Sequence, residues 1–154
     1  GRTQEIQRLI GRSLRSVVNL ENLGERQIKI DCDVIQADGG TRTASISGGF
    51  VAMYQAINLI KKNYNINKPI IKDFVAAISV GIVNEKEYLD LDYQEDSAAQ
   101  VDANFVMCES GTIAEIQTTG EEYFFSRNQF DALFNLAKIG IDKIIFEQKK
   151  SLSL

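Results

Sequence analysis

The run of residues 74–83 constrains the fold of this chain more than any other segment. Its sequence is Phe-Val-Ala-Ala-Ile-Ser-Val-Gly-Ile-Val, so almost every position is apolar. An uninterrupted apolar run rich in β-branched residues is typical of a strand that is buried on both faces. We therefore predict that residues 74–83 form the central strand of a sheet, with other structure packed on each side of it.

The composition is that of one globular domain, which we predict to span residues 1–154. Hydrophobic residues make up 44% of the chain, enough for a substantial core, and no apolar run is long enough to cross a membrane. The net charge of −4 excludes a globally basic surface, so any contact with nucleic acid must be local. The chain opens at Gly1 without an initiator methionine, which suggests a fragment or a processed product.

The residues that are absent or scarce narrow the possible chemistry. The chain contains no histidine, which removes histidine triads, histidine metal sites and histidine general bases. Acid–base chemistry must therefore fall to carboxylates, lysine, tyrosine or the substrate. Cys32 and Cys108 both lie in strand-like runs, so we expect buried thiols in a reducing compartment, the cytoplasm, rather than a disulfide.

Strands and helices mix without strict alternation, which predicts an α+β or mixed α/β fold. Helical periodicity covers residues 3–20, with Thr3 as the N-cap, and residues 45–62. A third helix follows Ser126, which forms a capping box with Gln129. Besides residues 74–83, the predicted strands are residues 28–36, 88–93, 101–108 and 112–118, and the last two form a hairpin.

The segment 38–43, Asp-Gly-Gly-Thr-Arg-Thr, is the best candidate for a binding site. A glycine pair between a strand and a helix lets backbone N–H groups approach a ligand, and the helix N-terminus favours an anion. Thr41 adds a hydroxyl, and Arg42 adds a planar fork that matches phosphate. The segment therefore predicts a phosphate site, although a glycine pair beside an arginine is also typical of an ordinary solvated turn.

An acidic cluster and a basic row complete the candidate features. Asp90 and Asp96 belong to a group of four carboxylates within seven residues, and Asp102 follows shortly. Strand alternation places Asp90 and Asp92 on one face, and such oxygen ligands suit Mg²⁺ or Mn²⁺, but a solvated acidic edge has the same composition. The row Arg8, Arg12 and Arg15 shares one helix face, which suits either an RNA backbone or plain solvent.

Three longer segments resemble the ribonuclease PH family. They are residues 1–12 (Gly-Arg-Thr-Gln-Glu-Ile-Gln-Arg-Leu-Ile-Gly-Arg), residues 31–45 (Asp-Cys-Asp-Val-Ile-Gln-Ala-Asp-Gly-Gly-Thr-Arg-Thr-Ala-Ser) and residues 89–102, which begin Leu-Asp-Leu-Asp-Tyr. The resemblance covers essentially the whole chain. It implies an α+β, mixed-sheet ribonuclease PH-type fold with ribosomal-protein-like βαβ layers, in which the N-terminal strands are missing.

The resemblance also implies an activity and the residues that perform it. Members of the family are phosphate-dependent 3′-to-5′ exoribonucleases that trim transfer-RNA precursors. Inorganic phosphate is their co-substrate, nucleoside diphosphates are their products, and Mg²⁺ or Mn²⁺ is the expected metal. By this resemblance the phosphate-binding residues are Arg2, Gly40, Thr41 and Arg42, and the catalytic and metal-binding pair is Asp96 and Asp102.

The expected partners also follow from the resemblance. They are transfer-RNA precursors and other RNA 3′ ends, together with further copies of the chain in a hexameric ring built as a trimer of dimers. A separate chain carrying the missing N-terminal part is a further expected partner. Three alternatives remain open: a non-catalytic RNA-binding subunit of an exosome-like ring, the two-copy relative polynucleotide phosphorylase, and a purely structural domain.

Overall fold

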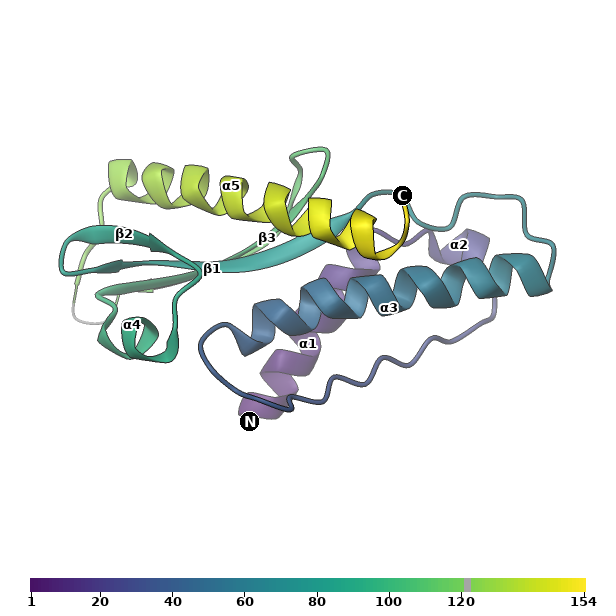
Figure 1. Ribbon diagram of the computed structural model, residues 1–154, viewed down its shortest axis with the longest axis horizontal. Coiled ribbons are helices and arrows are strands. Elements are labelled where there is room, and N and C mark those ends of the chain that lie inside the picture. The colour runs from purple at the N-terminus through teal and green to yellow at the C-terminus, as the bar shows by residue number, and fades with distance from the viewer. Residues whose placement is uncertain (121–122) are drawn as a thin grey trace.

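The computed structural model describes residues 1–120 and 123–154 and contains one four-stranded sheet with helices on both faces (Figure 1). In chain order the elements are α1 (Arg2–Ser16), α2 (Leu20–Leu23), α3 (Thr41–Asn63), β1 (Val75–Val83), β2 (Lys86–Leu89), α4 (Tyr93–Ala98), β3 (Val101–Cys108), β4 (Ile113–Gly120) and α5 (Arg127–Ser151). In the part of the chain that the structure describes, no helix is both long and apolar enough to pass through a bilayer.

The strands lie in the order β2-β1-β3-β4, and each neighbouring pair is antiparallel. Helix α5 covers one face of the sheet, and α3 covers the other with α1 beside it (Figure 1). The predicted α+β class is confirmed. The sheet is antiparallel rather than mixed across the described strands, because tight turns join β1 to β2 and β3 to β4 and such turns reverse the chain.

Strand β1 is the buried central strand that its composition predicts. All nine of its residues are buried. Alternation sends Ile78, Val80 and Ile82 into the core under α5, while Val75 and Ala77 face the core formed with α1 and α3. Two apolar faces on one strand explain why this segment lacks the polar alternation of a half-exposed strand.

The predicted strand at residues 28–36 is wrong. These residues run as extended chain outside the sheet, and none of their backbone groups bonds to the backbone of another described segment. Ile28 and Ile30 still pack against the core beside α1 and α3. Apolar alternation therefore marks a packed face here, but a strand also needs a hydrogen-bonded neighbour, which the pattern cannot supply.

The two cysteines have different environments, so the predicted burial holds for only one of them. Cys108 is buried at the end of β3, and burial raises the pKa of its thiol. Cys32 is exposed, because the segment that carries it does not join the sheet. Both thiols are free, in agreement with the expected absence of a disulfide between them.

Helices α1 and α3 begin earlier than their periodicity predicts. Helix α1 starts at Arg2 with Gly1 as its N-cap, so Thr3 is not the cap, and it ends at Ser16 rather than at residue 20. Helix α3 starts directly after Gly40, whose φ of 72° is the left-handed value that glycine tolerates. The early start of α3 makes the glycine pair part of the helix entry rather than part of a longer loop.

The predicted strand at residues 88–93 is also wrong over most of its length. Strand β2 ends at Leu89, and Asp90 has a φ of 60°. Asp92 then caps α4: its carboxylate accepts from the N–H of Glu95 at 2.8 Å, and the Glu95 carboxylate accepts from the N–H of Asp92 at 3.0 Å. Asp90 and Asp92 therefore do not share a strand face, because the capping box overrides the alternation.

The capping box predicted for the last helix is confirmed. The Ser126 hydroxyl accepts from the N–H of Gln129 at 3.2 Å, and the Gln129 side chain accepts from the N–H of Ser126 at 2.8 Å. The hairpin of β3 and β4 is confirmed as well, with a register shift between Val106 and Met107.

Hydrogen exchange should distinguish residues 28–36 from β1, although both segments were predicted to be strands. We expect the amides of residues 28–36 to exchange at least about a hundredfold faster than those of β1, since only the latter are held in a ladder. Exchange followed residue by residue by NMR measures this difference. Protection of residues 28–36 equal to that of Val80 would contradict the description, and dilution would then show whether a second copy supplies the partner strand.

Candidate active site

The glycine pair lies against the loop that carries the first acidic residues. A methyl group at Gly39 would overlap the carbonyl oxygen of Leu91 and lie 2.7 Å from the carbonyl carbon of Asp92. A methyl group at Gly40 would lie 3.9 Å from a carboxylate oxygen of Asp90. The N-terminus of α3 and the acidic segment are therefore in contact, although they are far apart in the sequence.

Asp38 fastens these two segments together. One of its carboxylate oxygens accepts from the N–H of Tyr93, the first residue of α4, and from the N–H of Gly39, each at 2.8 Å. These two hydrogen bonds, that of Tyr93 foremost, hold the pKa of Asp38 below its usual value. The sequence analysis did not single out Asp38, although an aspartate directly before a glycine pair commonly makes such turn contacts.

Strand β1 supports the same loop from below. The backbone oxygen of Ser79 accepts from the N–H of Asp90 at 2.8 Å, and the Ser79 hydroxyl accepts from the N–H of Leu91 at 3.1 Å. The Leu91 side chain packs so closely over Gly81 that a methyl group there would lie 2.7 Å from it. The serine and the glycine that interrupt the apolar run are thus the two positions at which β1 holds the loop.

The start of α3 keeps the features of an anion site. Thr41 and Arg42 are its first two residues, and no side chain among those described caps this end of the helix. The first-turn N–H groups and the positive end of the helix dipole are thus available to a ligand. The Arg42 side chain is 31% exposed, and its nearest carboxylate partner is Glu5 of α1, 4.0 Å away.

The two predicted acids lie on different elements, α4 and β3. Asp96 is exposed on α4, directly after the loop that contacts Gly39. Asp102 is half-buried on β3, where its register partners are Gly81 of β1 and Thr119 of β4. Among the described residues no ion pair joins Arg42 to either acid. Arg2 lies in the first turn of α1, but its side chain is outside the described part of the structure.

Asp102 belongs to a row of polar residues whose other members were not predicted from the sequence. These residues lie on the sheet face that is turned toward α1 and α3, and we call them the polar sheet face: Ser79, Asp102, Asn104, Gln117 and Thr119. Ser79 and Asn104 are buried, whereas Thr119 is exposed. The sequence does contain a signal for this row: Ser79 and Asn104 are polar residues within the otherwise apolar segments that form β1 and β3. A buried polar group usually has a specific partner or role, so these two positions could have been predicted as part of the site.

A cleft of about 530 Å³ opens beside the glycine pair. One end is formed by Asp38, Gly39 and Thr41, and the cleft continues between residues 30–36 and the small residues of α3, Ala44, Gly48 and Ala52. Of the predicted phosphate-binding residues, Thr41 lines this groove, whereas Gly40 and Arg42 are not part of its lining.

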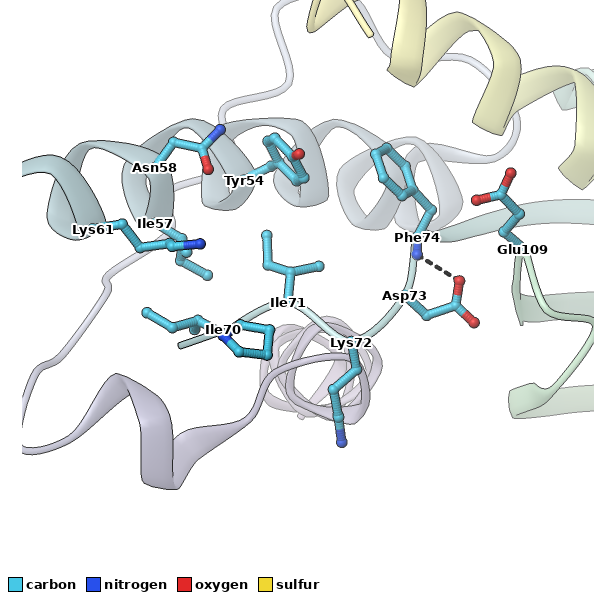
Figure 2. Close-up of a pocket in the computed structure, with 11 residues that line it drawn as sticks. Tyr54, Ile57, Asn58, Lys61, Ile70, Ile71, Lys72, Asp73, Phe74 and Glu109 are labelled. Atoms are coloured by element: carbon cyan, nitrogen blue, oxygen red, sulfur yellow. Dashed lines mark hydrogen bonds between the residues drawn. The ribbon is translucent and has the colours of Figure 1, made fainter. Parts of the chain in front are cut away.

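A second hollow, of about 310 Å³, lies toward the other end of α3 (Figure 2). Its lining mixes apolar side chains with polar and charged ones, among them two lysines and two acids, and both acids bond to other parts of the chain. The Asp73 carboxylate accepts from the N–H groups of Phe74 at 2.7 Å and Ser110 at 3.3 Å, and Glu109 pairs with Lys149. The two acids of this hollow are therefore already engaged by groups of the chain, whereas the first-turn N–H groups of α3 are not.

Two family models match the chain, and both describe the 3′ exoribonuclease family. Domain 1 of the family matches residues 1–57, and domain 2 matches residues 73–140. The chain belongs to the 3′ exoribonuclease family. The first match contains the glycine pair and Arg42, and the second contains Asp96 and Asp102, so the contact between the two segments joins parts that the family models treat separately.

Several solved structures share the fold of this chain, although their amino-acid sequences are only 16–18% identical to it. The archaeal exosome core matches with a TM-score of 0.69 and 18% identity over 97% of this chain and 63% of that chain. Rice (Oryza sativa) Rrp46 matches with a TM-score of 0.71 and 16% identity, over 99% of this chain and 66% of that chain. The Archaeoglobus fulgidus exosome with RNA bound to the active site matches with a TM-score of 0.66 and 16% identity, over 96% of this chain and 61% of that chain. The chain thus spans about two thirds of the length of these chains or less.

The described residues do not form a metal site from protein groups alone. They contain no group of three or more cysteine, aspartate or glutamate side chains that could hold an ion. Mg²⁺ usually binds through one or two carboxylates and completes its shell with water and substrate phosphates. That Asp96 and Asp102 hold such an ion stays a prediction.

Alanine at Gly39 should separate the two segments. The added methyl group meets the backbone of residues 91 and 92, so we expect Gly39→Ala to lower the free energy of unfolding by about 1–3 kcal/mol. Gly48 is the matched control, because a methyl group there meets nothing within 4 Å and alanine should stabilise α3 by about 0.5–1 kcal/mol. Urea unfolding measures both variants, and an unchanged midpoint for Gly39→Ala would contradict the contact.

The bridge made by Asp38 should be visible in the pH dependence of stability. Its pKa is lowered in the folded state, so its contribution is present above the ordinary value of 3.8 and is lost as the pH falls through the folded value. Asp38→Asn should therefore be less stable than the parent protein near neutral pH, and the difference should shrink in acid. Urea midpoints that differ equally at about pH 7 and about pH 2 would refute the bridge.

Proposed function

We propose that this chain carries the active site of a phosphorolytic 3′-to-5′ exoribonuclease that trims the 3′ ends of transfer-RNA precursors. The observation that carries the proposal is the contact of Gly39 with the backbone of Leu91 and Asp92, which sets an uncapped helix N-terminus beside an acidic segment. Membership in the 3′ exoribonuclease family supports the reaction class. Inorganic phosphate is the proposed co-substrate, and nucleoside diphosphates are the proposed products.

The phosphate is held at the start of α3. The N–H groups of Thr41 and Arg42 and the Arg42 guanidinium supply hydrogen bonds and positive charge to its oxygens. Arg2, in the first turn of the neighbouring α1, is proposed as the second phosphate-binding arginine. Holding the nucleophile in line with the terminal linkage can remove several kcal/mol from the barrier, because a bimolecular encounter becomes intramolecular.

The reaction then exchanges one phosphorus–oxygen bond for another. An oxygen of inorganic phosphate attacks the phosphorus of the terminal phosphodiester, and the bond from that phosphorus to the 3′ oxygen of the preceding nucleotide breaks. A protonated carboxyl group of Asp96 or Asp102 donates a proton to the departing oxygen and regains one from the hydroxyl of the attacking phosphate. Where the two carboxylates instead hold Mg²⁺ or Mn²⁺, the ion would neutralise the charge on the departing oxygen in place of the proton, because a carboxylate that binds a metal ion is not protonated. The chain has no histidine, so a carboxyl group is the natural choice for this acid.

The assembly is proposed on the same basis. We infer that the chain acts in the cytoplasm in a hexameric ring, a trimer of dimers, with Mg²⁺ or Mn²⁺ at Asp96 and Asp102. A further chain carrying additional N-terminal sequence would bring more of the RNA-binding surface. The shared fold with subunits of exosome assemblies supports ring formation.

A second candidate is a non-catalytic RNA-binding ring subunit. The solved structures with this fold include an archaeal exosome core and rice Rrp46, which favours this alternative at the level of fold. The presence of Arg42, Asp96 and Asp102 favours catalysis instead, because a purely binding subunit does not need an anion site beside acids.

Phosphate dependence tests the proposal. A transfer RNA with a 3′ extension, incubated with the protein and phosphate, should yield nucleoside diphosphates by chromatography, and omission of phosphate should abolish them. Arg42→Ala should lower this rate about a hundredfold or more by removing charge stabilisation. Arg127→Ala is the matched control, since Arg127 is an exposed arginine on α5 paired only with Asp131 among the described residues.

Two outcomes would count against this function. Release of nucleoside monophosphates without added phosphate would mean hydrolysis rather than phosphorolysis. RNA binding without any nucleotide release would favour the non-catalytic ring subunit. Normal phosphorolysis by Arg42→Ala would remove Arg42 from the proposed mechanism.

A further inference from the structure

Two contacts fix the direction of one side of α1. Near its start, Glu5 lies 4.0 Å from Arg42 at the N-terminus of α3. Two turns later, the Arg12 guanidinium makes a forked pair with Glu115 of β4, with bonds of 3.0 Å and 2.5 Å. This side of α1 therefore faces both the start of α3 and strand β4.

Arg8 lies between these two anchors on the same side of the helix. It follows Glu5 by three residues and precedes Arg12 by four, and these are the spacings of neighbours along one helix face. Arg8 is exposed, and it forms no ion pair with any residue that the structure describes. Its charge thus remains available to a ligand, whereas that of Arg12 is already matched by Glu115.

The neighbouring part of the sheet needs such a cation if an anionic chain is to lie on it. Next to Glu115 on β4 come Gln117, which donates to Glu115 at 3.2 Å, and Thr119, the register partner of Asp102. These groups can hydrogen-bond a ribose or a base edge, but they supply no positive charge. Arg8 is the described cation between Arg42 and Arg12 on this side of α1.

We infer that Arg8 binds a backbone phosphate of the RNA substrate, beside the linkage that is attacked and separate from the inorganic phosphate at Arg42. This inference rests on the proposed function and deepens it. The terminal nucleoside lies on the polar sheet face at Gln117 and Thr119, and Arg8 pairs with the phosphate of a preceding nucleotide. Arginine suits this role because its fork matches two phosphate oxygens.

RNA binding measured without turnover tests the inference. The probe is a fluorescent single-stranded oligoadenylate, and its affinity is measured by anisotropy over a range of salt concentrations in phosphate-free buffer. Arg8→Ala should weaken binding about tenfold and lower the slope of log affinity against log salt by about 0.7, as expected for one lost phosphate contact. Arg8→Lys should keep the slope, since it keeps the charge.

Arg15→Ala is the matched control. Arg15 lies on the same row two turns from Arg8, but its guanidinium folds back over Gly11, where a methyl group would lie 3.1 Å from it. Arg15→Ala should bind the oligonucleotide like the parent protein. The KM for inorganic phosphate, measured in the phosphorolysis assay, should be unchanged in Arg8→Ala, which separates its role from that of Arg42.

Failure of the inference about Arg8 can be distinguished from failure of the proposed phosphorolytic function. Arg8-dependent RNA binding without phosphorolysis would overturn the proposed reaction but support this inference. Phosphorolysis with unchanged affinity and salt slope in Arg8→Ala would overturn the inference alone. A raised KM for phosphate in Arg8→Ala, equal loss in Arg15→Ala, or no RNA binding by the parent protein would also overturn it.

Discussion

The close backbone approach between Gly39 and the Leu91–Asp92 peptide is the contact on which the candidate site depends. Only a residue without a Cβ fits there, so the sequence position itself enforces the geometry. The contact places the uncapped start of α3 next to α4, and Asp38 locks it by accepting from both segments. Without this contact, nothing would hold the start of α3, which carries Arg42, against the loop that leads into α4 and Asp96.

Strand β1 holds that contact in a fixed position, because it packs against the cores on both faces of the sheet. Its apolar residues fill the cores on both sides of the sheet, which leaves the strand little freedom to shift. At its far end the pattern changes: Ser79 bonds the backbone of Asp90 and Leu91, and Gly81 makes room for the Leu91 side chain. The interruptions in an otherwise apolar run thus mark where the scaffold meets the site.

The sequence predicted the elements whose signals are local or redundant. The buried strand, the hairpin and the capping box at Ser126 each rest on several agreeing cues, and each is present. The prediction of a strand at residues 28–36 failed, because alternating apolar residues indicate a packed face but do not show that the segment pairs with another strand. The strand at 88–93 failed because the Asp92 capping box competes with alternation over the same residues. The polar sheet face was missed because it forms only when register aligns three strands.

Charge at this site is local, which bears on the proposed binding of RNA. The chain carries a net charge of −4, so its overall field repels a polyanion, and attraction depends on a few arginines at short range. Arg12 is paired with Glu115, whereas Arg42 has only a distant ion-pair partner in Glu5, so Arg42 is the less compensated of these two charges. Interactions over such distances weaken as the Debye length shortens with salt. Under the proposed function these few arginines, rather than the overall field, hold the last phosphates of a single-stranded 3′ end, with Arg42 binding inorganic phosphate and Arg8 binding the RNA backbone.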